Sequence, residues 1–426
     1  MNGKHFPLDK AALEALIRRH PTPFYLYDEM AIRRNVRRIA GAFAKFPSYK
    51  EHFAVKALPN PFILKILADE GLGADCASYP ELLLADMAGI GGEDIMFSSN
   101  ETPAEEYREA RKLGAVINLD DFSHIEFLER AAGIPELISC RYNPGPLKGG
   151  NAIIGKPEEA KYGFTREQII RGFGLLRDKG AKRFALHTMV ASNELRVEYH
   201  IETGRLLFDL AGEILRRTGV RIEFINLGGG VGIPYRPEEE ALDFERLSAG
   251  LKAAYEEIVV PAGLHPLGIR TEMARAITGP FGWLVTTAIH RKSIYREYIG
   301  LDACMADLMR PGLYGAYHHI SVAGKEDAPL TETCDVVGSL CENNDKFAVQ
   351  RKLPKIDIGD RVIIHDAGAH GRAMGFNYNG KLRCGELLLR PDSSLAVIRR
   401  PETTEDYFAT LDTDALNRFN PALTKE

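Results

Sequence analysis

Phe224-Ile-Asn-Leu-Gly-Gly-Gly-Val-Gly232 is the stretch that decides the fold of this chain. It joins a short apolar run to the glycines Gly228, Gly229 and Gly230, whose backbone amides can approach an anion closely. In a doubly wound dinucleotide-binding sheet, such a turn follows the first strand. Here it follows the seventh apolar run, and a (β/α)8 barrel forms its phosphate site from the loops after strands 7 and 8. The position of the turn therefore favours a barrel.

Short apolar or β-branched runs support this interpretation, because segments of helical period separate them. Strands that alternate with helices are expected to pair in parallel, since a parallel crossover needs a return of helical size. The pattern predicts an α/β fold, a (β/α)8 barrel of the TIM type. The expected strands are His52–Ala57, Ala74–Ser78, Ile95–Ser99, Ala115–Leu119, Leu137–Tyr142, Phe184–Val190, Phe224–Leu227 and Ile269–Met273.

The pattern changes past residue 285, where short alternating segments are separated by Gly, Pro and Asp turns. They predict a second, C-terminal domain, an antiparallel β-sandwich or barrel. Pro23-Phe-Tyr-Leu-Tyr27 predicts one more strand ahead of the barrel. We expect a barrel domain over residues 30–285 and a β domain made of residues 1–29 and 286–426. The expected strands after the barrel are Trp283–Ile289, Ser293–Leu301, His318–Val322, Arg361–His365, Glu386–Leu389 and Ser394–Ile398.

Composition argues against several classes of protein. The 426 residues are too many for one ordinary core, and the net charge of −5 offers no basic surface for nucleic acid. We expect no nucleic-acid partner, no membrane segment and no secretory signal, and hence a cytoplasmic protein. The 6 cysteines include no C-x-x-C pair, which argues against a metal site and suits a reducing compartment.

Three sites at predicted strand ends could carry chemistry. Lys56 ends the first run between apolar neighbours; burial favours the neutral amine that a Schiff base requires, although a lysine at a strand end can also extend into solvent. The glycine turn is the second site. Glu272 and Arg275 at the end of the eighth run are the third, either as a partner for a pyridinium nitrogen or as a structural ion pair.

These sites are expected to converge, because strands 1 and 8 of a closed barrel are neighbours. An amine, a phosphate cradle and an acid at one barrel mouth fit a phosphorylated aldehyde. Pyridoxal 5'-phosphate is therefore the expected cofactor.

Further motifs follow one another along the chain: Phe53-Ala-Val-Lys-Ala57, Gly73-Ala-Asp75, Arg141-Tyr-Asn-Pro144, Lys161-Tyr-Gly163, Leu227-Gly-Gly-Gly230, Glu272-Met-Ala-Arg275, Met309-Arg-Pro-Gly-Leu-Tyr314, Gly338-Ser-Leu-Cys-Glu342 and Asn377-Tyr378-Asn379. In this order they resemble the barrel-type (fold type III) pyridoxal-phosphate decarboxylases, and the diaminopimelate decarboxylases most closely. The resemblance extends from about Pro21 to Leu411, nearly the whole chain.

The resemblance implies a role for each matched residue. Lys56 would bind the cofactor covalently, Glu272 would keep its ring nitrogen protonated, and Cys341 of a second subunit would protonate the carbanion left by decarboxylation. Arginine side chains would bind the substrate's distal carboxylate, and Glu342 its distal ammonium group. The implied cofactor-binding residues are Lys56, Asp75, His187, Ser192, Gly228, Gly229, Gly230, Glu272, Arg275 and Tyr378. The implied substrate-binding residues are Arg275, Arg310, Tyr314, Glu342 and Tyr378.

Several positions depart from the family pattern. Met189 stands where the family has a histidine that stacks on the cofactor ring, and Ala191 stands where glycine is usual. His187 lies two residues earlier, which would be the same strand face, and could take over part of the stacking. The other departures are Leu58 beside the lysine, Met273 and Ala274 in place of Pro and Gly, and Asn343-Asn344 in place of two small residues.

The expected substrate must carry a distal carboxylate that the arginines can bind. Ornithine and arginine lack one, and a buried arginine without a partner is costly, whereas meso-2,6-diaminopimelate carries one. We therefore expect a homodimer with shared active sites that decarboxylates meso-diaminopimelate to L-lysine and CO2, the last step of lysine biosynthesis. The alternatives are a sister decarboxylase for another basic or carboxylated amino acid, and a catalytically silent relative that binds the cofactor.

Overall fold

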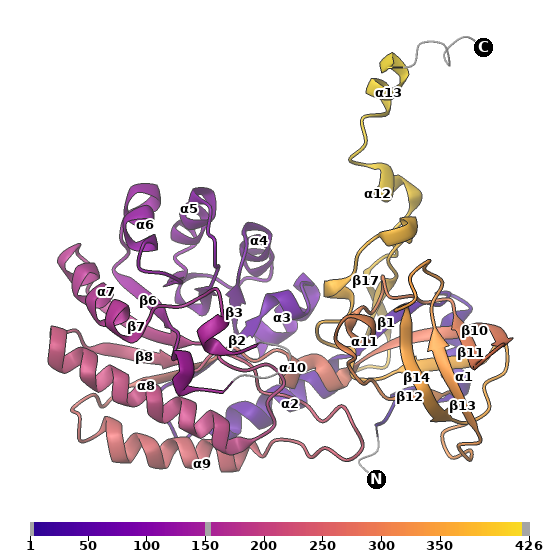
Figure 1. Cartoon of the computed structure of the whole chain (residues 1–426), viewed down its shortest axis with the longest axis horizontal. Helices are drawn as coiled ribbons and strands as arrows, with labels where there is room; N and C mark the ends of the chain where they lie inside the picture. Colours follow the sequence, from indigo (N-terminus) through magenta and orange to yellow (C-terminus); the bar gives the residue numbers. More distant parts are fainter. Residues whose placement is uncertain (1–3, 150–154, 420–426) are drawn as a thin grey trace.

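A closed barrel and a β domain lie beside each other in the computed structural model, which describes residues 4–149 and 155–419 (Figure 1). The barrel strands are parallel and follow sequence order, and the first pairs with the last to close the ring. The predicted (β/α)8 barrel is confirmed. Its strands are β2 (Tyr49–Ala54), β3 (Gly73–Cys76), β4 (Ile95–Phe97), β5 (Val116–Leu119), β6 (Leu137–Tyr142), β7 (Arg183–Thr188), β8 (Ile222–Asn226) and β9 (Gly268–Thr271).

Helices surround the barrel and bury one apolar face each against it. In the first of them, Ile32, Val36, Ile39 and Phe43 recur at helical spacing and are buried, while the Asp28 carboxylate caps the helix start by accepting from Ala31 N at 2.9 Å. The surrounding helices are α2 (Glu29–Phe43), α3 (Pro61–Asp69), α4 (Tyr79–Met87), α5 (Ala104–Lys112), α6 (His124–Ala132), α7 (Arg166–Asp178), α8 (Val197–Thr218) and α9 (Phe244–Ala254).

The β domain confirms the expected second, strand-built part of the chain. Most of its strand pairs are antiparallel, but β1 runs parallel to β16 and β11 runs parallel to β13. Two of its strands, β13 and β14, lie in a region where no strand was predicted. The strands are β1 (Phe24–Asp28), β10 (Gly282–Ser293), β11 (Glu297–Leu301), β12 (Ile320–Val322), β13 (Glu332–Val337), β14 (Lys346–Leu353), β15 (Arg361–Ile364), β16 (Gly385–Leu389) and β17 (Leu395–Arg399).

The shorter α-helices are α1 (Lys10–Ile17), α10 (Arg275–Thr278), α11 (Arg310–Tyr314), α12 (Thr404–Phe408) and α13 (Thr413–Phe419). The last two extend away from the β domain (Figure 1). Within residues 4–149 and 155–419, no helix combines the length and the apolar character needed to cross a membrane.

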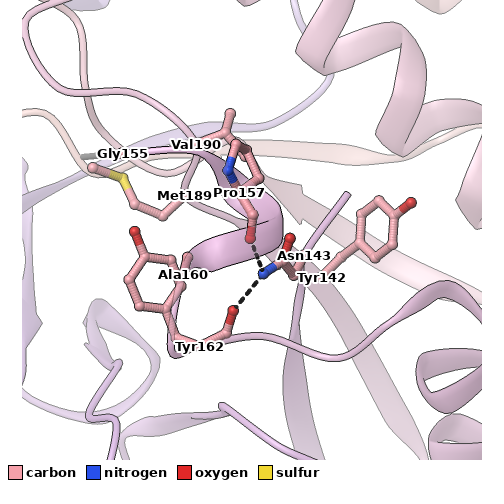
Figure 2. A pocket seen from close by; sticks show the side chains of 8 residues that line it. All are labelled: Tyr142, Asn143, Gly155, Pro157, Ala160, Tyr162, Met189 and Val190. Carbon is pink, nitrogen blue, oxygen red and sulfur yellow. Dashed lines mark hydrogen bonds between the residues drawn. The ribbon is translucent and has the colours of Figure 1, made fainter. Parts of the chain in front are cut away.

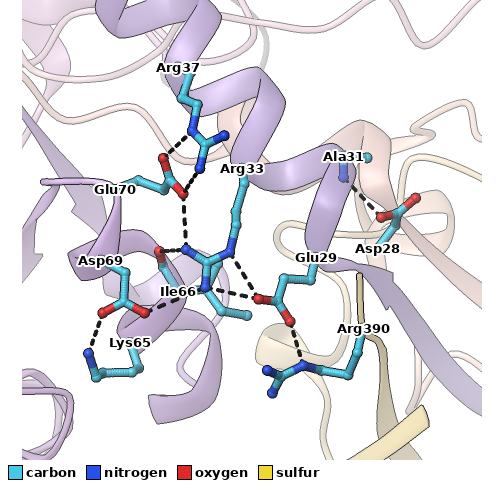
Figure 3. A network of polar contacts seen from close by, with 10 residues as sticks. All are labelled: Asp28, Glu29, Ala31, Arg33, Arg37, Lys65, Ile66, Asp69, Glu70 and Arg390. Atoms are coloured by element: carbon cyan, nitrogen blue, oxygen red, sulfur yellow. Dashed lines mark hydrogen bonds and ion pairs between the residues drawn. The ribbon is translucent and has the colours of Figure 1, made fainter. Parts of the chain in front are cut away.

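A network of charged side chains ties the barrel helices to the β domain (Figure 3). Arg33 on α2 donates to Glu29 at 2.9 Å and to Glu70, after α3, at 3.0 Å. The other oxygen of Glu29 lies 2.8 Å from Arg390, in the turn between β16 and β17. The Glu29 side chain is 2% exposed and that of Arg390 is 47% exposed, so solvent reaches the pair from the arginine side. The network thus links α2 and the residue after α3 to the turn between β16 and β17.

Candidate active site

Lys56 lies at the carboxyl end of the first barrel strand. β2 ends at Ala54, and Lys56 occupies a 3-10 turn over Val55–Ala57 instead of the expected strand His52–Ala57. Val55 and Ala57 are buried and anchor the turn, whereas the Lys56 side chain is exposed. Of the two possibilities for Lys56, burial in the strand is wrong, because the chain leaves the strand three residues earlier than predicted. The amine still lines the cavity of the barrel mouth.

That cavity has a volume of about 380 Å³ and brings most of the predicted site together. Eight predicted residues line it: Lys56, Asp75, His187, Ser192, Gly229, Gly230, Glu272 and Arg275. Its wall also includes His370 of the β domain, whose backbone N–H donates to Ala57 O at 2.8 Å. The cavity thus lies across the carboxyl ends of the barrel strands, where barrel enzymes have their active sites, and the β domain closes one side.

The glycine turn packs against backbone on every side. A Cβ at Gly228 would lie 2.2 Å from Thr188 O, and one at Gly230 would lie 2.5 Å from Ala191 O. The φ angles of these two glycines are +67° and +90°, a region that other residues rarely adopt. Gly228 is set back from the cavity, where its N–H donates to the Asn226 side chain at 2.9 Å. The turn therefore exposes backbone at Gly229 and Gly230, as a phosphate cradle requires.

Glu272 is a buried carboxylate with two donors. Asn226 Nδ2 donates to one oxygen at 2.6 Å, and His187 Nε2 lies 2.9 Å from the other. Burial alone would raise the pKa of Glu272, but the charge and hydrogen bond of His187 outweigh it, so the pKa is lowered. The alternative of a Glu272–Arg275 ion pair is not what forms, because Glu272 binds His187 while Arg275 donates to Tyr235.

The pKa of Asp75 is shifted in the direction opposite to that of Glu272. Burial and then the negative charge of Glu272 raise its pKa, against an opposing effect of Lys56. The pKa values of the two carboxyl groups are thus shifted in opposite directions, a division common in active sites. Asp75 Oδ1 and His187 Nδ1 are buried and have no hydrogen-bond partner among the described residues. Unpartnered polar atoms in a cavity that also holds a glycine cradle fit a polar, phosphorylated ligand.

Met189 lies just past the end of β7, so the alternation of strand faces that would have placed it with His187 does not apply. Its thioether accepts from Gly229 N at 3.3 Å. Figure 2 shows Met189 and Tyr162 on the walls of a small neighbouring pocket, and both residues also line the main cavity. Asn143 holds this side by donating to Pro157 O and Tyr162 O at 2.9 Å each (Figure 2).

The remaining predicted residues do not line the cavity of the single chain. Arg310 is buried behind Arg275, and both donate to the hydroxyl of Tyr235. Tyr314 and Tyr378 are 47% and 54% exposed, Cys341 is exposed, and Glu342 is partly exposed. Sequence reasoning missed Asn226, Tyr235 and His370 as parts of the site. Asn226 and Tyr235 flank the glycine turn, which is a sequence signal that could have found them.

The described residues contain no cluster of three or more His, Cys, Asp or Glu side chains that could hold a metal ion. The lysine, the glycine cradle and the ionised acid at one barrel mouth define a barrel-type pyridoxal-phosphate enzyme. The family model for the pyridoxal binding domain of pyridoxal-dependent decarboxylases matches residues 30–279. The chain belongs to this family, and pyridoxal phosphate is its cofactor.

Proteins similar to this chain align with it over almost its full length. Protein TabA of Pseudomonas amygdali pv. tabaci is 42% identical, covering 98% of this chain and 96% of its own. The diaminopimelate decarboxylase of Methanothermobacter thermautotrophicus is 34% identical, covering 94% of each chain. The crystal structure of Helicobacter pylori diaminopimelate decarboxylase with L-lysine superposes with a TM-score of 0.84 at 30% identity, covering 95% of this chain and 100% of that one. The protein is a decarboxylase of the diaminopimelate decarboxylase type.

Proposed function

We propose that this protein decarboxylates meso-2,6-diaminopimelate to L-lysine and CO2, the last step of lysine biosynthesis. The observation that carries the proposal is the pair of buried arginines, Arg275 and Arg310, beside a cavity that Lys56 and Glu272 also line. Buried guanidinium groups favour an anionic partner, and the distal carboxylate of diaminopimelate supplies one. The relatives named above as diaminopimelate decarboxylases support the same substrate.

The residues divide the chemistry among them. Pyridoxal phosphate, when bound, supplies the electron sink for the electrons left as CO2 departs. Lys56 would bind the cofactor and yield to the amino group of the substrate, and the backbone of Gly229 and Gly230 would receive the phosphate. Ionised Glu272 would hold a proton at the ring nitrogen, because its negative charge favours the protonated pyridine.

The other implied roles belong to the same proposal. Asp75, His187, Ser192 and Gly228 would complete the cofactor site, with His187 fixing the Glu272 carboxylate. Arg275 and Arg310 would bind the distal carboxylate of the substrate.

A homodimer with shared sites is part of the proposal. Cys341 and Glu342 lie outside the cavity of their own chain and are at least partly exposed, so a second copy would supply them. Tyr314 would bind the distal carboxylate together with the arginines, and Tyr378 would order the cofactor and the substrate. Cys341 would then deliver the proton to the substrate carbon, and Glu342 would bind the distal ammonium group. We also propose a cytoplasmic location, with a barrel domain over residues 30–285 and a β domain over residues 1–29 and 286–426.

A second candidate is a sister reaction on another carboxylated or basic amino acid. Met189, Met273, Ala274 and Asn343 depart from the family pattern, and Met189 lies in the cavity wall itself. A changed cavity wall favours a different substrate. The lysine, the acid and the arginines are unchanged, so the type of reaction would stay the same. A catalytically silent relative is the third alternative, and the intact Lys56 argues against it.

A decarboxylation assay separates these candidates. The purified protein, loaded with pyridoxal phosphate, is given meso-diaminopimelate, ornithine or arginine, and CO2 release is measured. We expect the highest kcat/KM with diaminopimelate. A preference for ornithine or arginine would refute the substrate, and no turnover of any amino acid by the loaded dimer would establish the silent relative.

A further inference from the structure

Two buried guanidinium groups meet at one tyrosine hydroxyl next to the cavity. Arg275 Nη1 donates to Tyr235 Oη at 2.6 Å, and Arg310 Nη1 donates to the same oxygen at 2.8 Å. The two guanidinium carbons also lie 5.6 and 4.7 Å from the centroid of the Tyr235 ring. All three residues are buried. A neutral side chain thus holds two like charges side by side, and its ring face adds a favourable cation–π contact to each.

No acid in the described part of the chain forms an ion pair with either arginine. Asp366 feels the charge of Arg310, but its carboxylate is already paired with Lys4 Nζ at 2.8 Å. Burial is the largest cause of the lowered pKa of Arg310; Tyr235 opposes this effect and the charge of Arg275 adds to it. An anion bound between the two arginines would relieve both the desolvation and the repulsion.

His318 supports Arg310 from the other side. Its Nδ1 lies 2.8 Å from His365 O, and because a carbonyl oxygen only accepts, this nitrogen carries the proton. Nε2 therefore has a free lone pair and accepts from Arg310 Nη1 at 2.9 Å. Burial lowers the pKa of His318 to about 3, so the ring is neutral near pH 7. Arg310 is held by two neutral acceptors, which fix its position and leave its charge for a ligand.

We propose that Tyr235 is a positioning residue that sets Arg275 and Arg310 as a preformed clamp for the distal carboxylate of the substrate. The inference rests on the proposed function and extends it to the origin of specificity. Two long side chains held at one oxygen lose little freedom when the carboxylate binds. The same pair discriminates against amino acids without a second carboxylate, since they would leave two charges buried and unpaired.

L-lysine and cadaverine test the clamp, because they are the same diamine with and without one carboxylate. Each is titrated into the enzyme loaded with pyridoxal phosphate, and binding is followed by the visible absorbance of the cofactor. The wild type should bind L-lysine more tightly. Tyr235→Phe keeps the ring and removes the hydroxyl, so the affinity for L-lysine should fall roughly ten- to hundredfold while that for cadaverine changes less than about twofold.

Tyr255→Phe is the matched control. Tyr255 is buried like Tyr235, and its hydroxyl accepts from Leu267 N at 2.8 Å, at a position that does not line the cavity. This variant should leave both affinities unchanged.

Each other outcome decides a separate point. If the wild type binds L-lysine and cadaverine equally well, the proposed carboxylate site is refuted, and the proposed function is refuted with it. If the wild type discriminates and Tyr235→Phe discriminates equally well, the clamp is wrong while the function stands. An equal loss for both ligands, or a loss of cofactor binding, would assign Tyr235 a merely structural role and overturn the inference.

Discussion

A single added methyl group at Gly229 is a stringent test of the cofactor cradle. A Cβ built there lies 2.4 Å from the carbonyl oxygen of Glu272, about 1 Å inside the 3.4 Å at which ordinary contact begins. The neighbour is backbone and cannot rotate away, and it is fixed because Glu272 N donates to Gly228 O at 2.8 Å. We expect Gly229→Ala to lower the free energy of unfolding by about 1–3 kcal/mol.

Cofactor binding should weaken as well, because relief of this clash displaces both the glycine turn and Glu272. A misplacement of this size can cost roughly a hundredfold in kcat/KM. Urea unfolding measures the stability, titration with pyridoxal phosphate followed by visible absorbance measures the cofactor affinity, and the decarboxylation assay measures kcat/KM. Gly174→Ala on α7 is the control, because no heavy atom lies within 4 Å of its added Cβ and alanine favours the helix. Wild-type stability and cofactor affinity in Gly229→Ala would refute the tight approach of turn and strand end.

Three further predictions concern the amine, the dimer and pH. Lys56→Ala should abolish the reducible visible absorbance of the bound cofactor, and an unchanged spectrum would exclude Lys56 as its attachment point. Mixing the inactive variants Lys56→Ala and Cys341→Ala should restore about a quarter of wild-type activity, because about half of the randomly paired dimers carry one intact site; no recovery would count against shared sites. Burial raises the pKa of Glu51 to about 8 from 4.5, so the folded state retains a proton that the unfolded chain releases, and stability should fall as pH rises from about 4.5 to about 8. Glu51→Gln should flatten this decline in urea unfolding, and an unaltered slope would contradict the assignment.

The barrel was predictable because its strands are buried on both faces. β6, for example, is buried at all six positions, so a short apolar run marks it in the sequence. The ends of the strands were harder to predict from the sequence. They depend on how far the neighbouring strand continues, and β2 pairs with β3 only as far as Ala54. The exposed turn of Lys56 follows from this tertiary pairing, which no local pattern records.

The site was predictable where a motif places chemistry at a strand end, as at Gly229 and Glu272. Tyr235 escaped because it lies in an irregular loop, and its partners Arg275 and Arg310 are 40 and 75 residues further along the chain. β13 and β14 escaped for a related reason: Arg351 and other charged residues interrupt their alternation, and the register between the two strands shifts.

The position of β1 inside the β domain has a consequence for synthesis on the ribosome. Its residues Phe24, Tyr25, Leu26 and Tyr27 are buried between β10 and β16, and Phe24 faces Gly385 across the parallel pair. This segment leaves the ribosome before both of its partners, and all the barrel strands are translated between β1 and β16. An apolar strand must therefore stay unpaired on that side until the barrel has been translated, so we expect chaperones to protect β1 in the nascent chain.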